Sequence, residues 1–342
     1  MRKTNLLHLA LNGICLGLLA VGGGLQARAA SVKQPVLLVV NQGDVDISID
    51  APAPDKALDT KPEDQHGVHV HEAAVSPDGK TAYLPVYGST GVGKPGIDGH
   101  EMLVMDVATH KIVGHLDFGH SVRPHCAVYS RANGLLYVTT ELDKAVTVID
   151  PKTLKIVGHV PTGQEQSHML AVSRDGKRGY TANVGPGTVS VLDMVGRKTL
   201  AVIPVSGEVQ RIALSANDGL VFTSDQTQPR LAVIDTATNK LKSWIALPGL
   251  GYGAAATRDG RWLLVAIPAK GQVAVVDLRA MKVARTIAVP SAPQEILIRP
   301  DGKVAYVSCN QSAKVAGIDL GDWKVQSLIG VGHGADGLAW AR

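Results

Sequence analysis

Three histidines occupy one equivalent position in three successive repeats of this 342-residue chain. They are His71, His125 and His168, each five residues before the serine that marks its repeat. Neutral imidazole is the commonest protein ligand of zinc, copper and iron, and three histidines that leave one position open describe a catalytic metal site. The spacing therefore predicts a shared site for a transition metal (Cu, Zn or Fe), provided that the fold brings the repeats around one point.

The remaining repeats carry polar residues at the same place, where they could bind a ligand. These residues are Gln210, Tyr252, Gln294 and Asp336, and the next position adds Arg211 and Glu295. Glu72 follows His71 and could orient an imidazole through a hydrogen bond. His100 lies in a segment, Gly88–Glu101, that is about ten residues longer than its counterparts. We expect His100 to join the other histidines only if this insertion folds inward.

Two alternatives to a metal site remain open at this stage. The polar positions could form a ligand pocket without metal, or they could hydrogen-bond only to water. A further possibility is that Arg211, His168 and Glu165 or Glu208 bind and deprotonate an anionic substrate, as a lyase or lactonase would. Ser167 and His168 are neighbours on a predicted strand and point apart, so no nucleophile dyad is expected.

The repeat that positions these residues is marked twice. A turn of Asp or Asn followed by Gly recurs from Asp78-Gly79 to Asp301-Gly302, and an aspartate ending a β-branched strand recurs from Asp50 to Asp319. Both markers have a period of about 42 residues. Each unit reads as four short strands, which is typical of a β-propeller blade. The sequence thus predicts an all-β fold, a seven-bladed propeller with four antiparallel strands per blade.

The two ends of the repeat region complement each other. Val36–Asn41 and Asp46–Asp50 read as the second and third strands of a unit, and Gly337–Trp340 reads as a first strand with nothing after it. We expect the C-terminal strand to pair with the N-terminal ones, since this closes the ring and removes an open sheet edge.

Several segments resemble the YVTN-repeat (YncE-like) propeller family. They are Tyr137-Val138-Thr139-Thr140, Tyr306-Val307-Ser308, Ser76-Pro77-Asp78-Gly79 and Val146-Thr147-Val148-Ile149-Asp150. The resemblance runs from about Val36 to the end of the chain. It implies the seven-bladed fold but no single function, because that fold hosts ligand binders, adhesion proteins, lyases, lactonases and metalloenzymes.

Residues 1–29 read as a secretory signal peptide, which leaves 30–342 as a single propeller domain. Arg2 and Lys3 precede an apolar run, and Ala27-Arg28-Ala29 offers small residues for cleavage. Cleavage takes three basic residues from a net charge of +4 and leaves +1, which argues against a nucleic-acid partner. No later apolar run is long enough to span a bilayer. We expect a periplasmic or extracellular protein whose two remaining cysteines, Cys126 and Cys309, are free thiols.

The leading function is therefore an exported ligand-binding propeller with its ligand, a small molecule or a metal ion, at the axial end. A metal-dependent oxidoreductase or lyase at the same place is the enzymatic alternative. A scaffold that binds a protein partner through its rim is the third class.

Overall fold

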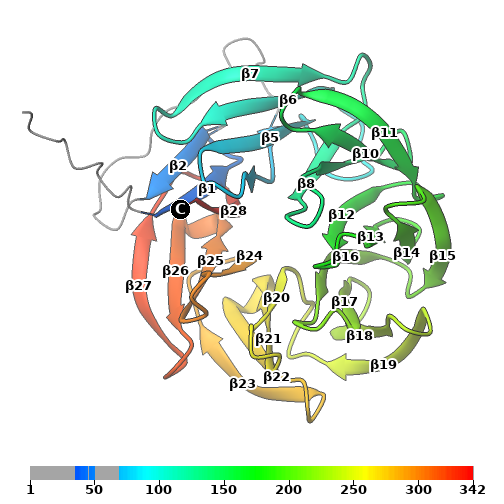
Figure 1. The fold of residues 1–342 in the computed structure, drawn as a ribbon. Coiled ribbons are helices and arrows are strands. Elements are labelled where there is room, and N and C mark those ends of the chain that lie inside the picture. The colour runs from blue at the N-terminus through cyan, green and yellow to red at the C-terminus, as the bar shows by residue number, and fades with distance from the viewer. Residues whose placement is uncertain (1–34, 45, 51–68, 342) are drawn as a thin grey trace, which may run out of the picture. The chain divides into compact units, whose positions relative to one another are not determined.

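The structure is a computed structural model that describes residues 35–341 apart from 45 and 51–68. The predicted signal peptide lies outside the described residues. In the described part, the regular elements are strands and two short 3-10 turns, η1 (Pro268–Lys270) and η2 (Asn310–Ser312). The strands form seven antiparallel sheets arranged in a ring (Figure 1), which confirms the predicted seven-bladed β-propeller.

Five blades share one four-stranded order, in which the first strand is innermost and the fourth is outermost (Figure 1). Blades two and three are β8 (Pro124–Tyr129), β9 (Leu136–Thr140), β10 (Ala145–Asp150), β11 (Lys155–Pro161), β12 (Ser167–Val172), β13 (Arg178–Asn183), β14 (Thr188–Asp193) and β15 (Lys198–Pro204). Blades four to six are β16 (Val209–Leu214), β17 (Leu220–Asp225), β18 (Arg230–Asp235), β19 (Lys240–Ala246), β20 (Ala254–Ala256), β21 (Trp262–Ile267), β22 (Gln272–Asp277), β23 (Lys282–Ala288), β24 (Pro293–Ile298), β25 (Val304–Cys309), β26 (Lys314–Asp319) and β27 (Lys324–Gly330).

Blade one differs because its first strand is interrupted. It consists of β3 (His69–Val70), β4 (Ala74–Val75), β5 (Thr81–Gly88), β6 (Asp98–Asp106) and β7 (Lys111–Asp117). The chain leaves the strand path between β3 and β4, and this is where His71 and Glu72 lie.

Blade seven closes the ring as the sequence predicts. Its described strands are β28 (Ala335–Ala341), β1 (Val36–Asn41) and β2 (Asp46–Asp50), in the order β2-β1-β28. The β1–β28 pairing places Leu37 opposite Trp340 and Leu38 opposite Ala339. The first and last strands of the domain thereby satisfy each other's backbone hydrogen bonds.

The two repeat markers are turn devices. In blade three the Ser173 hydroxyl donates to Asp175 Oδ1 at 2.6 Å, and the same oxygen accepts the Lys177 backbone N–H at 3.0 Å. Gly176 has a φ of 70° in this turn, a conformation that glycine adopts without steric cost. At the end of β14, Asp193 accepts the backbone N–H of Gly196 at 2.8 Å, which is an Asx-type turn.

The apolar core lies between neighbouring blades rather than on the axis. One cluster joins blades one and two through Tyr83 and Val138, and another joins blades five and six through Leu264 and Val307. The inner ends of the first strands are therefore free to carry polar side chains. Both cysteines of the described part, Cys126 and Cys309, are buried and unpaired, as expected.

Candidate functional site

The three aligned histidines lie against one another at the start of the innermost strands, and we call them the histidine cluster. The ring centroids of His71 and His125 are 5.2 Å apart, and those of His125 and His168 are 3.5 Å apart. His125 and His168 are only 1% and 3% exposed, whereas His71 is half-buried. Equivalent positions in successive blades thus bring together side chains that are far apart in the sequence.

Tyr87, at the end of β5, packs against all three rings. Its ring centroid lies 4.8 Å from that of His71, 5.2 Å from that of His125 and 5.6 Å from that of His168. The side chain is fully buried. Tyr87 therefore forms an aromatic wall of the cluster.

Glu141 follows β9 and is the carboxylate that contacts the histidine cluster. Its Oε1 accepts a hydrogen bond from Nδ1 of His168, and its Oε2 accepts one from the Tyr87 hydroxyl at 2.9 Å. Glu141 is 3% exposed. Tyr87 and Glu141 occupy equivalent positions where the second strand ends, in blades one and two. Aligning the second strands as well as the first would have revealed them.

Burial keeps two of the imidazoles neutral. It lowers the pKa of His71 and His125 well below the usual value, and the neighbouring His168 lowers both further. Burial also raises the pKa of Tyr87, with Glu141 adding to the shift. Nδ1 of His125 is buried without a hydrogen-bond partner. His71 and His125 are thus uncharged and can offer nitrogen lone pairs to a ligand. Nδ1 of His125 in addition has unused hydrogen-bonding capacity.

A buried ionic network fills the other side of the axis. Arg211 of blade four donates from Nη1 to Glu72 of blade one and from Nη2 to Asp336 of blade seven at 2.7 Å. Its guanidinium lies 4.9 Å from the ring centroid of Tyr252. The structure thus places Glu72 against Arg211 and not against an imidazole, so its predicted orienting role is wrong. Glu141 makes the carboxylate contact with an imidazole instead.

Three carboxyl groups compete for the one guanidinium of Arg211. Burial raises the pKa of Asp336 to about 7 and that of Glu295 well above its usual value, and in both cases the charge of Glu72 adds to the shift. The charge of Arg211 opposes both shifts. One Glu295 oxygen accepts the Leu338 backbone N–H at 2.8 Å. These groups largely satisfy one another.

The remaining predicted ligand-binding positions differ in their surroundings. Gln210 has a buried Oε1 with no hydrogen-bond partner, and Nε of Arg211 is unpartnered as well. Gln294 is half-buried, and its backbone carbonyl accepts the Gly253 N–H at 3.1 Å. Two unused polar atoms therefore lie on blade four, next in sequence to the blades of the histidine cluster.

His100 stays outside the histidine cluster. Its Nδ1 lies 3.3 Å from Asp117 Oδ1 on the next strand, and its side chain is 45% exposed. The insertion instead binds Arg123 at the entrance of blade two. Arg123 donates to the Lys94 carbonyl at 2.7 Å and to the Asp98 carboxylate, and its guanidinium lies 5.7 Å from the Tyr87 ring centroid.

The lyase-like arrangement does not assemble. Glu165 pairs with Lys144 at 3.0 Å on the surface, and Glu208 is exposed. Arg211 is occupied by Glu72 and Asp336. Ser167 donates to Thr162 and Asn183 rather than to a histidine.

The histidine cluster is not a preformed metal site. Within the described ranges, no group of three or more His, Cys, Asp or Glu side chains is already placed to hold a metal ion. Any coordination by the cluster therefore requires ring movement.

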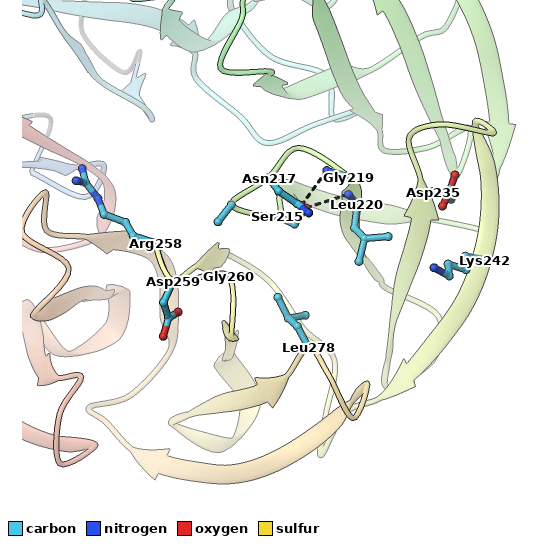
Figure 2. Close-up of a pocket in the computed structure, with 11 residues that line it drawn as sticks. Ser215, Asn217, Gly219, Leu220, Asp235, Lys242, Arg258, Asp259, Gly260 and Leu278 are labelled. Atoms are coloured by element: carbon cyan, nitrogen blue, oxygen red, sulfur yellow. Dashed lines mark hydrogen bonds between the residues drawn. The ribbon is translucent and has the colours of Figure 1, made fainter.

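A pocket of about 550 Å³ opens on the opposite face, between blades four and five (Figure 2). It is lined by charged side chains of both signs, Asp235, Lys242, Arg258 and Asp259. Asn217 accepts hydrogen bonds from Ser215 at 2.8 Å and from Gly219 at 3.1 Å within its own turn (Figure 2). None of the buried unpartnered side-chain atoms in the described part of the chain belongs to the residues of this pocket. The axial end is therefore the better candidate.

Comparisons with known proteins support the fold alone. No family model and no curated protein matches the sequence. Among solved structures, the chain is similar to one titled Kuenenia stuttgartiensis hydrazine synthase, with a TM-score of 0.67 and 16% identity over 83% of this chain and 93% of the other. The described residues include no helix that could cross a membrane. The chain is a seven-bladed β-propeller.

Proposed function

We propose that this protein is an exported ligand-binding propeller of the YVTN-repeat type whose axial end binds a transition-metal ion, zinc, copper or iron, through His71, His125 and His168. The observation that carries the proposal is the mutual contact of three imidazoles from three successive blades, two of them buried, with an unpartnered nitrogen on the central ring. A buried polar atom without a partner costs free energy, so its retention suggests a ligand that satisfies it.

The electrostatics favour a metal cation over an anionic ligand at the cluster. Metal ions bind the neutral form of imidazole, and burial holds His71 and His125 in that form. Glu141 adds a carboxylate beside His168, as is common behind metal-bound histidines. An anionic ligand would instead lie close to this carboxylate and be repelled by it.

The ring distances define the movement that binding requires. Two imidazoles on one ion, with metal–nitrogen bonds of about 2.0–2.1 Å and a tetrahedral angle, have ring centroids roughly 5 Å apart. The 5.2 Å between His71 and His125 fits this value. The 3.5 Å between His125 and His168 is shorter, so one of these two rings must turn as the ion enters.

Metal analysis of the purified protein, followed by calorimetric titration with Zn²⁺ and Cu²⁺, tests the proposal. We expect about one ion per chain and a weaker affinity when any one of the three histidines is replaced by alanine. His115→Ala is the matched control, because His115 is exposed on the outermost strand β7. Unchanged metal content in all three single variants would refute the proposal. No metal binding, together with stabilisation by a small organic molecule, would favour the metal-free pocket instead.

Export is tested separately by cell fractionation and N-terminal sequencing. We expect the protein in the periplasm or medium with its chain starting near residue 30. A full-length chain retained in the cytoplasm would refute export without affecting the metal site.

A further inference from the structure

We propose that Glu141 is the positioning residue of the histidine cluster: it fixes His168 in the tautomer that leaves Nε2 available to the ligand, and Tyr87 and Arg123 hold Glu141 in place. The inference deepens the proposed function and rests on it for the nature of the ligand. Its first test, however, needs no metal.

The tautomer follows from the hydrogen bonds of the carboxylate. An ionised carboxylate only accepts hydrogen bonds. Both of its oxygens are in use, Oε2 with the Tyr87 hydroxyl and Oε1 with Nδ1 of His168. Nδ1 of His168 must therefore carry a proton, and in the neutral imidazole Nε2 then keeps the lone pair that a metal ion would use.

Burial keeps Glu141 in its two hydrogen bonds, to Tyr87 and to His168. Glu141 and Tyr87 are 3% and 0% exposed, so water cannot readily replace either hydrogen bond. The other carboxyl groups of the axial end are engaged elsewhere: Glu72 and Asp336 pair with Arg211, and Glu295 accepts the Leu338 backbone N–H. Within the part of the chain that the structure describes, Glu141 is thus the carboxylate that is hydrogen-bonded to the histidine cluster.

The blade-one insertion gains a role in this arrangement. Its Lys94 carbonyl and Asp98 carboxylate bind Arg123, whose guanidinium packs 5.7 Å from the ring centroid of Tyr87. The Gly99 carbonyl also accepts the backbone N–H of Arg123 at 3.0 Å. The insertion therefore supports the tyrosine that in turn supports Glu141, although its own His100 stays outside the cluster.

Histidine nitrogen NMR on metal-free protein is the first test, at about pH 8.5, above the ordinary imidazole pKa of ~6.5. The His168 signals are assigned by their loss in His168→Gln. We expect the Nδ1–H tautomer in the native protein and a mixture of tautomers in Glu141→Leu. An Nε2–H tautomer in the native protein, or an unchanged tautomer in Glu141→Leu, would overturn the inference while leaving the proposed metal site intact.

Metal affinity and the Cu²⁺ electron paramagnetic resonance spectrum form the second test. We expect Glu141→Leu to weaken Zn²⁺ binding by about 10- to 100-fold, the usual cost of losing a partner behind a metal ligand, and to change the Cu²⁺ spectrum. Glu165→Leu, in which an exposed glutamate is lost, should change neither. If the native protein binds no metal, the proposed function fails and this inference falls with it; native affinity and spectrum in Glu141→Leu would refute the positioning role alone.

Tyr87→Phe is a second variant that tests the same inference if Glu141→Leu does not fold. This variant retains the carboxylate and the aromatic wall but removes the hydroxyl that donates to Oε2. We expect a smaller loss of affinity in the same direction and a detectable change in the Cu²⁺ spectrum. A Tyr87→Phe protein with native affinity and spectrum would contradict the inference.

Discussion

The polar groups on the two sides of the propeller axis are used in different ways. On blades one to three, three imidazoles pack together, and the central one retains an unpartnered buried nitrogen. On the other side, Arg211 of blade four pairs with Asp336 of blade seven and with Glu72, which reaches it from blade one, in a buried ionic network. Polarity at a repeat position is therefore a poor guide to a binding site. A better guide is how completely the charged or polar group is paired within the protein: Nδ1 of His125 has no partner, whereas Arg211 pairs with two carboxylates and leaves only Nε unused.

The two sides of the axis should also contribute differently to the stability of the fold. Breaking a buried ion pair by removing one partner leaves an uncompensated charge, so the Arg211 network is expected to be sensitive to mutation. A buried imidazole with an unpartnered nitrogen already carries a desolvation cost, so its replacement by an apolar residue removes that cost. One side should therefore support the fold, and the other should serve a ligand at some expense to stability.

Arg211→Met should give the largest effect on stability. The substitution leaves Glu72, Asp336 and Glu295 without their cation, and we expect a loss of about 3–5 kcal/mol in the free energy of unfolding. Urea denaturation monitored by circular dichroism measures it. Arg174→Met is the control, since its pair with Asp218 is 3.5 Å long with a 72%-exposed arginine side chain, and it should cost about 1 kcal/mol or less. Equal losses in the free energy of unfolding for the two variants would contradict a structural role of the Arg211 network.

The two sides should also respond to pH with opposite signs. The pKa of Asp336 is raised to about 7, so the folded protein binds more protons than the unfolded chain between pH ~4 and ~7, and the contribution of this group to stability falls as pH rises. The pKa of His125 is lowered, so the unfolded chain binds more protons below pH ~6.5, and the contribution of this group rises with pH.

Difference profiles isolate these two groups in metal-free protein. The free energy of unfolding of Asp336→Asn minus that of the native protein should increase from pH ~4 to ~7, because the variant lacks the falling contribution. The same difference for His125→Gln should decrease as pH rises towards ~6.5. Urea denaturation at several pH values measures both. Parallel profiles would show that the two sides are electrostatically alike.

His125→Leu should give the smallest change in stability. Leucine replaces the imidazole with an apolar side chain of similar size, and it removes a buried nitrogen that has no partner. We expect a melting temperature that is unchanged or slightly higher, together with weaker metal binding. A fall in stability as large as that of Arg211→Met would mean that the histidine cluster is part of the structural core.

The sequence predicts those residues of the site that occupy equivalent positions in successive repeats. Alignment of the first strands found His71, His125 and His168, because equivalent positions in a ring of blades are related by rotation about the axis. Glu141 falls outside this alignment because it follows a second strand, β9, and reaches the cluster only through its side chain. His100 was a candidate through its place in the insertion, but a short-range contact with Asp117 on the adjacent strand keeps it away.

The sequence by itself determined the period, the four strands of each blade, the blade count and the ring closure, because turn chemistry and strand alternation are local properties that recur along the chain. The tertiary structure alone decided which polar groups pair. Arg211 of blade four reaches Glu72 of blade one and Asp336 of blade seven, and Glu141 of blade two reaches His168 of blade three. Such pairing depends on the reach and direction of side chains from different blades, and no spacing within a repeat encodes it.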